Sequence, residues 1–242
     1  MCQMTQAETN EIEWTGRTGP FSLSVRRGVF APTSTSKTLA DALEIDAGDT
    51  VIDVGCGSGV LAFVAAKLGA AKVYGCDLSA PAVEMAGRNA DRLGLSDVCE
   101  FRQGDLLDPM RDVRASVLIG DVSGIPDDLA AVSGWFQDVP AGGPTGAELP
   151  RQLLETIGDT LQPGGRLYLP TGSLQDENAI LAAARRVFGD NIEPVLERTF
   201  PLPDLVAKAA ATARLMKAGL LKLHQRGSRL LWDLRVWRCV RA

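Results

Sequence analysis

The sequence contains little of what metal sites, disulfide frameworks and membrane anchors require. Its 242 residues include one histidine, His224, and five cysteines, no two of which form a C-x-x-C pair. This composition predicts reduced, buried thiols and no metal site. No run of about 18 apolar residues occurs, so we expect no membrane partner. The polar N-terminus lacks a basic-then-apolar signal pattern, and we expect a cytoplasmic protein.

An excess of positive charge is also lacking. The chain carries 25 Lys and Arg residues against 30 Asp and Glu residues, which gives a formal net charge of −5. Nonspecific binding to nucleic acid needs a basic face that displaces the counterions of the phosphates. The charge balance therefore argues against a nucleic-acid partner, and it leaves small molecules and proteins open.

From residue 50 onward, short apolar strands alternate with apolar helices, which predicts a sheet covered by helices on both faces. The pattern indicates strands at residues 51–54, 73–76, 98–101, 116–119, 166–169, 192–200 and 230–240. Helices are expected at residues 60–68, 82–93, 148–161, 174–188 and 205–223.

The N-terminal part has a different pattern. Residues 1–20 are polar and predict a loose arm or a short lid, and residues 21–25 alternate as a half-buried strand does. Thr33 to Ser36 provide N-caps for a leading helix. We expect residues 1–44 to form an arm or lid with that helix, and residues 45–242 to form the main domain.

A glycine loop follows the strand at residues 51–54. Gly55, Gly57 and Gly59 are each two residues apart, whereas a dinucleotide fingerprint requires G-x-G-x-x-G. Asp53 precedes the loop, and its carboxylate would repel a pyrophosphate and attract the ammonium group of S-adenosylmethionine (SAM). The spacing therefore predicts a SAM cradle, with bare backbone and helix N–H groups facing the ligand. Cys56 belongs to the same cradle.

Two further strand ends carry candidate cofactor residues. Asp77 ends the second strand, 18 residues after Gly59, and is placed to accept hydrogen bonds from ribose hydroxyls, with Leu78 beside it. Asp105 follows the third strand, where it can accept from the adenine amino group while Leu106 covers the ring. Gly104 belongs to this turn. The alternatives are that Asp77 complements a helix dipole and that Asp105 is a turn acid.

With these three strand ends in view, residues 50–107 resemble motifs I to III of the class I SAM-dependent methyltransferases. The resemblance extends from residue 45 to the end. It implies an α/β, Rossmann-like fold with a seven-stranded, mostly parallel sheet of order 3-2-1-4-5-7-6, whose last strand is antiparallel. It also implies SAM as the cofactor.

The loop after the fourth strand should face the transferable methyl group. From residue 120 to residue 165 the chain resembles the glutamine N5-methyltransferases of release factors, in which Asn-Pro-Pro-Tyr precedes Ile-Pro. Aligning that pair on Ile125-Pro126 places Asp121-Val122-Ser123-Gly124 where the tetrapeptide would stand. Residues 28–39 and 161–174 resemble ribosomal-protein lysine methyltransferases, whose appended recognition domain we do not expect here.

In the release-factor family, Asn-Pro-Pro-Tyr clamps the planar amide nitrogen of the acceptor. Because this amide clamp is missing here, we expect an enzyme that methylates a nitrogen or oxygen of a small molecule in biosynthesis. Asp121 and Ser123 are the candidate catalytic residues, and Asp121 also touches the cofactor. Thr33 and Thr35 either line the methionine end of SAM or only cap their helix. Trp135 with Phe136 forms either an apolar wall over the acceptor or an ordinary lid contact.

The sequence leaves three other functions open. One is an enzyme that consumes SAM through its aminobutyrate tail and releases methylthioadenosine, and a second is a protein methyltransferase. The third is a SAM-binding scaffold without activity. The apolar stripe of residues 205–223 would either cover the pocket or pair two chains in a homodimer.

Overall fold

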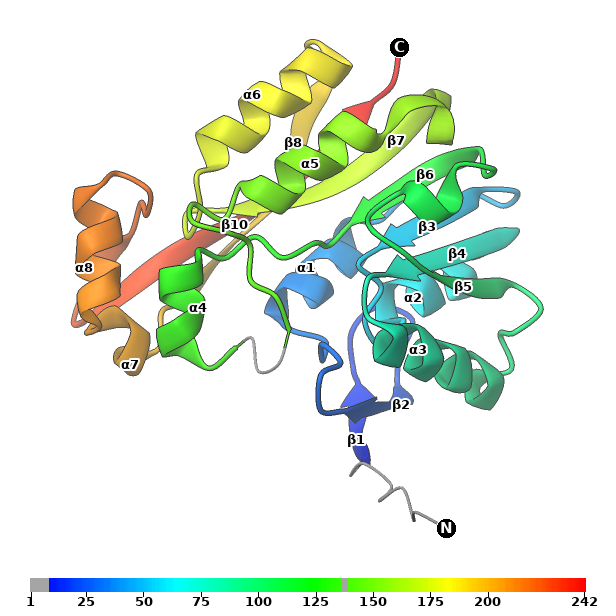
Figure 1. Ribbon diagram of the computed structural model, residues 1–242, viewed down its shortest axis with the longest axis horizontal. Coiled ribbons are helices and arrows are strands. Elements are labelled where there is room, and N and C mark those ends of the chain that lie inside the picture. Colours follow the sequence, from blue (N-terminus) through cyan, green and yellow to red (C-terminus); the bar gives the residue numbers. More distant parts are fainter. Residues whose placement is uncertain (1–8, 136–138) are drawn as a thin grey trace.

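The structure is a computed structural model that describes residues 9–135 and 139–242. One large sheet runs through the molecule, and helices cover both of its faces (Figure 1). Its strand order is β5-β4-β3-β6-β7-β10-β8, and β9 pairs with β10. The strands of this sheet are β3 Thr50–Val54, β4 Lys72–Asp77, β5 Cys99–Gln103, β6 Ala115–Gly120, β7 Leu161–Gly172, β8 Ile192–Pro201, β9 His224–Arg226 and β10 Arg229–Val240.

The topology confirms the predicted α/β methyltransferase fold. The strands β5, β4, β3, β6 and β7 are parallel, and β10 runs antiparallel between β7 and β8. The seven predicted strands therefore lie in the predicted order. The short strand β9 was not predicted, and it makes the sheet eight-stranded.

Two hydrophobic clusters hold the helices against the two faces of the sheet. Neighbouring residues of β3 enter different clusters, because successive side chains of a strand point to opposite faces. Val51 packs with α1 and α2, and Ile52 packs with α5 and α6. The helices of the two layers are α1 Ser34–Ala42, α2 Val60–Leu68, α3 Ala80–Leu93, α5 Glu148–Thr156 and α6 Glu177–Phe188.

The prediction of a loose arm is wrong for the described residues before residue 20. β1 (Thr9–Trp14) pairs antiparallel with β2 (Phe21–Arg26) in a hairpin. Trp14 is buried against Phe21, with ring centroids 6.2 Å apart, and Phe21 meets Phe63 of α2 edge to face. Polar composition concealed the strand because one face of β1 is exposed, and Trp14 anchors its end.

The helix predicted at residues 148–161 is also shorter than expected. α5 ends at Thr156, and β7 already begins at Leu161, so Pro163-Gly164-Gly165 lies inside a strand. The pairing of β6 with β7 is irregular at this place, and Gly164 N–H donates to the Arg241 carbonyl. A proline is tolerated at such an irregularity because no ladder bond is lost there.

Residues 205–223 form two short helices, α7 (Asp204–Ala207) and α8 (Ala210–Lys217), instead of one. They stand beside α4 (Asp127–Ser133), a helix that was not predicted, at one end of the sheet (Figure 1). Their apolar residues pack with α4 in a third cluster. The stripe is thus used largely within this chain. We call residues 200–232 the C-terminal lobe.

The expectation of reduced, buried thiols is confirmed for the four described cysteines. Cys56, Cys76, Cys99 and Cys239 are free and buried. Within residues 9–135 and 139–242, none of the helices combines the length and apolarity needed to cross a bilayer. His224 lies in β9 and is exposed.

Candidate functional site

A cavity of about 830 Å³ opens at the carboxyl ends of β3, β4 and β6. In an open parallel sheet, this is where the winding direction reverses and ligands bind. The cavity has two halves. From the expectations of the sequence, we call one half, lined by the glycine loop and the ends of β4 and β5, the cofactor half, and the other, lined by the end of β7 and by the C-terminal lobe, the acceptor half.

The glycine loop is held tightly between neighbouring segments. The N–H groups of Gly55 and Cys56 both donate to the Cys76 carbonyl, at 2.8 and 2.9 Å. Gly57 has a positive φ of 52°, and a Cβ there would lie 3.2 Å from the Phe30 carbonyl oxygen. A Cβ on Gly55 would likewise lie 3.1 Å from the Asp121 carbonyl oxygen, so glycine lets the loop pass close to its neighbours in a positive-φ conformation while its backbone lines the cavity.

Asp53 lies beneath this cradle and is 1% exposed. One carboxylate oxygen accepts from the Ala62 N–H at 3.0 Å, while the other oxygen and the nearby Ser58 hydroxyl have no partner among the described residues. Burial, reinforced by the Asp121 and Asp77 carboxylates, raises the pKa of Asp53 to about 8. An unpartnered buried carboxylate fits a cationic ligand group, and the ammonium of SAM has that chemistry.

Asp77 connects the second strand end to the loop. Its two carboxylate oxygens accept from the N–H groups of Gly57 and Ser79, each at 2.9 Å. A carboxylate has about four acceptor positions, so hydroxyls of a ligand can still be bound. Asp77 thus fastens the glycine loop as well as facing the cavity, a role that the sequence did not reveal.

The third strand end contributes the turn that holds Asp105 and Leu106. Leu106 has a positive φ of 45°, uncommon for a residue with a side chain, and its carbonyl accepts from the Cys76 thiol at 3.0 Å. Asp105 is exposed at the rim, and so is Leu78, which is 62% exposed. Both leucines line the cavity.

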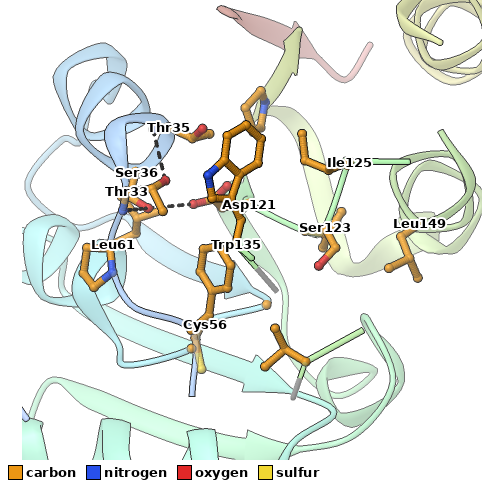
Figure 2. A pocket seen from close by; sticks show the side chains of 18 of the residues that line it. Thr33, Thr35, Ser36, Cys56, Leu61, Asp121, Ser123, Ile125, Trp135 and Leu149 are labelled. Atoms are coloured by element: carbon orange, nitrogen blue, oxygen red, sulfur yellow. Dashed lines mark hydrogen bonds between the residues drawn. The ribbon is translucent and has the colours of Figure 1, made fainter. Parts of the chain in front are cut away.

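Asp121 stands between the two halves (Figure 2). Its carboxylate accepts from the Ser36 hydroxyl at 3.2 Å, and its carbonyl oxygen is 3.1 Å from where a Cβ on Gly55 would be. Burial raises the pKa of Asp121 to about 6, and the hydrogen bond from Ser36 opposes this shift. Asp121 is therefore largely ionised at neutral pH.

The start of α1 forms the wall next to Asp121. Thr33 caps the helix by accepting from the Thr35 N–H at 3.2 Å, and Ser36 accepts from the Thr33 N–H at 3.3 Å. Thr33 and Thr35 also line the cavity, so capping and lining occur together.

The loop after Asp121 closes the other side. Ser123 lies across Asp121 from Thr33 and Ser36 in Figure 2, and its hydroxyl donates to the Pro140 carbonyl at 3.0 Å. Trp135 lines the cavity and is 36% exposed. Phe136, which we expected beside it, lies outside the described residues.

The structure brings most predicted site residues to this one cavity. Gly59 and Gly104 do not line it: a Cβ on Gly59 would lie 2.6 Å from the Phe63 ring, and one on Gly104 would lie 2.8 Å from Pro109. These two glycines serve local packing. Among the lining residues that the sequence did not reveal are Phe30, Leu149, Pro170, Thr171, Leu174, Gln175, Phe200, Pro201, Pro203, Trp232 and Leu234. No local motif marks them, because only the sheet order brings them to the cavity.

The charges in the cavity are of one sign. The acidic lining residues are Asp53, Asp77, Asp105 and Asp121, and Asp53, with a pKa of about 8, is largely protonated at neutral pH in the ligand-free chain. No Lys, Arg or His is among the described residues that line the cavity. A one-signed cavity favours ligand groups of the opposite charge.

The sequence matches known methyltransferases over the cofactor half. Residues 31–124 match the family model of the ribosomal protein L11 methyltransferase (PrmA), which is under half of the chain. The release factor glutamine methyltransferase of Moorella thermoacetica is 37% identical over 155 residues, which cover 61% of this chain and 54% of that protein. The ribosomal protein L11 methyltransferase of Alkaliphilus metalliredigens is 37% identical over 115 residues, covering 46% of this chain and 36% of that one.

A solved structure agrees at the level of the fold. The ribosomal protein L11 methylase of Lactobacillus delbrueckii subsp. bulgaricus superposes with a TM-score of 0.53 at 16% identity, over 88% of this chain and 82% of that one. Together, the sheet, the glycine loop and the matched segment make the chain similar to the class I SAM-dependent methyltransferases. Within this class it is similar to the L11 and release-factor enzymes, although it spans only about half of one relative and about a third of the other.

These relatives correct one expectation. We expected the acceptor to be a small molecule, but both matched relatives are named for protein substrates. The expectation rested on the missing Asn-Pro-Pro-Tyr motif. Loss of an amide clamp argues against an amide acceptor, and it carries no information about whether the acceptor belongs to a protein.

Proposed function

We propose that the protein transfers the methyl group of SAM to an amine nitrogen of a protein. The observation that carries this proposal is the position of Asp121, a half-buried carboxylate between the cofactor half and the acceptor half of a cavity whose charged residues are all aspartates. An amine is the acceptor group that such a carboxylate binds and orients best. The names of the matched relatives support a protein of the translation machinery as the acceptor, which would place the enzyme in the cytoplasm.

The residues of the cofactor half have separate tasks in this proposal. Asp53 would bind the ammonium group of SAM, Asp77 its ribose and Asp105 its adenine, with Leu106 against the ring. The backbone of Gly55, Cys56 and Gly57 would approach the ligand closely. When bound, SAM supplies an electrophilic methyl group on a sulfonium.

Asp121 acts on the acceptor. An amine attacks only with a free electron pair, so an ammonium group must first lose its proton. In the transfer the new N–C bond forms as the S–C bond breaks, and the nitrogen then loses a proton to Asp121 or to water. The carboxylate of Asp121, with a pKa of about 6, accepts a hydrogen bond from the nitrogen and directs its electron pair. Positioning of this kind supplies much of the rate of a displacement.

The absence of the Asn-Pro-Pro-Tyr clamp favours an amine over an amide. An amide nitrogen is planar and weakly nucleophilic, so it needs acceptors and rigid walls on both sides. Here Asp121 follows β6 in place of the clamp, and the Ser123 hydroxyl already donates to the Pro140 carbonyl. Nucleic-acid acceptors fit less well, because phosphates would meet a cavity whose described charges are negative.

The test is a methylation assay with protein acceptors. The purified enzyme is incubated with SAM and with unmethylated ribosomal proteins and release factors, and intact masses are recorded. We expect one or more proteins to gain methyl groups on amines, and we expect Asp121→Asn to lose this activity. Asp128→Asn is the matched control, because Asp128 is an exposed acid paired with Arg214. Unmethylated proteins together with accumulating methylthioadenosine would favour the SAM-consuming alternative instead.

A further inference from the structure

The C-terminal lobe is fixed to the body of the protein by its own buried cluster. Leu202, Val206, Leu215 and Leu221 of the lobe pack with Leu129 of α4 and with Leu174 after β7. The lobe is therefore not a loose extension. Its position relative to the end of β7, where the acceptor half of the cavity lies, is set by packing.

One side of this lobe is an aromatic wall of the acceptor half. Phe200, at the end of β8, and Trp232, near the start of β10, lie with ring centroids 5.3 Å apart and planes tilted by 33°. Trp232 also reaches the end of β7, where a Cβ on Gly172 would be 3.3 Å from its ring. Both rings line the cavity, together with Pro201. Such a wall gains most by covering an apolar group of a ligand.

A buried polar side chain lines the same cavity. Gln175 is 7% exposed, lines the cavity, and its amide nitrogen has no hydrogen-bond partner among the described residues. Two glycines leave room for it: a Cβ on Gly124 would lie 2.4 Å from the Gln175 amide oxygen, and a Cβ on Gly146 would lie 3.0 Å from the Gln175 Cβ. A buried donor without a partner is costly, and an acceptor atom of a ligand would satisfy it.

We propose that the acceptor half selects an amine that is flanked by an apolar or aromatic side chain in the acceptor polypeptide. The flanking side chain would lie against Phe200 and Trp232, and the Gln175 amide would donate to a main-chain carbonyl of the acceptor. Asp121 would hold the amine itself, so the recognised unit is a cation next to an apolar group. This inference rests on the proposed function, and it adds the selection of sequence around the amine.

The charges of the cavity favour an acceptor segment whose amine has an apolar neighbour. With no described Lys, Arg or His in the lining, a carboxylate flanking the amine would find no ion-pair partner, whereas an apolar flank would exclude water from the Asp121–amine pair. The cavity is continuous from the glycine loop to the lobe, so one acceptor segment can reach both Asp121 and the aromatic wall.

The experiment uses synthetic peptide amides with a central lysine, prepared with free and with acetylated N-termini. In one set the neighbours of the lysine are glycine, in a second phenylalanine and in a third glutamate. Methylation is followed by mass spectrometry, and binding by the tryptophan fluorescence of the protein. We expect the phenylalanine peptides to have a kcat/KM at least about tenfold above that of the glycine peptides, and the glutamate peptides the lowest value.

Three variants locate the preference. We expect Phe200→Ala to remove most of the advantage of the phenylalanine peptides over the glycine peptides. Gln175→Leu, which keeps the size of the side chain, should raise KM for all peptides about tenfold and leave kcat nearly unchanged. Leu205→Ala is the matched control on the same lobe, because Leu205 is 73% exposed and does not line the cavity.

The outcomes separate this inference from the proposed function. Equal kcat/KM and equal binding for the glycine and phenylalanine peptides would overturn the inference and leave amine methylation standing. If no peptide is methylated or bound while SAM binds normally, amine methylation itself fails. If the preference persists in Phe200→Ala with an unchanged fold, the aromatic wall is not its source and the inference is wrong.

Discussion

The two halves of the cavity are built in different ways. The cofactor half consists of short strand ends followed by a glycine or an acid, so its residues lie close together in the sequence as well as in space. The acceptor half is assembled from the end of β7, the C-terminal lobe and the loop that holds Asp121, segments spread over more than a hundred residues of the chain. A local motif can therefore mark a cofactor site, whereas an acceptor site on the same fold depends on long-range assembly.

The largest effect is expected where the two halves meet. Asp121→Asn keeps the shape of the side chain but removes the charge that holds the amine. We expect kcat to fall about 10²–10⁴-fold, the range for loss of a positioned acid–base group. Calorimetry should show nearly unchanged affinity for SAM. A variant with normal turnover would make Asp121 a loop residue without a part in the reaction.

The next effect is confined to the cofactor half. Asp53→Ala or Asp77→Ala should weaken SAM binding by about 1–3 kcal/mol, the usual cost of losing hydrogen bonds to charged groups. Titration calorimetry measures this directly, and Phe200→Ala in the acceptor half serves as the control with unchanged SAM affinity. If Asp53→Ala and Asp77→Ala both bound SAM like the parent protein, the assignment of the cofactor half would fail.

The raised pKa of Asp53 has a consequence for stability. Its pKa is about 8 in the folded chain against 3.8 for an unperturbed aspartate, so the folded protein retains a proton that the unfolded chain has lost. The free energy of unfolding of the ligand-free protein should therefore decrease as pH rises from 4 to 8, through this group. We expect Asp53→Asn to remove that dependence and to raise the unfolding temperature at pH 8, by ~2–4 °C for each kcal/mol gained. A steeper pH dependence in the variant would contradict the assignment.

The smallest effect concerns the hydrogen bond from Ser36 to Asp121. This bond lowers the pKa of Asp121 against the effect of burial, so Ser36→Ala should raise that pKa. The acidic limb of the kcat–pH profile should move upward by about half a unit to one unit, as expected for a hydrogen bond of ~1 kcal/mol. Thr33→Ala, which removes the helix cap without touching Asp121, should leave that limb in place. An equal shift in both variants would show a general effect of α1.

The difference between local motifs and long-range assembly also explains which features could be predicted from the sequence. The strands and the glycine loop were predictable because apolar runs and turn residues act locally. The hairpin strand ending at Trp14 and the start of β7 at Leu161 were not, because pairing with other strands overrides their local propensity. Asp77 shows the limit inside the site: its carboxylate was predicted to face ribose, but its bonds to Gly57 and Ser79 depend on the folded loop.

The most direct test of the account is the fate of SAM. The purified protein is incubated with SAM, first alone and then with amine-bearing protein acceptors, and the small-molecule products are identified by mass spectrometry. We expect intact, bound SAM in the first case, and S-adenosylhomocysteine with a methylated protein in the second. Methylthioadenosine formed without any acceptor would contradict it, because SAM would then be consumed through its own tail.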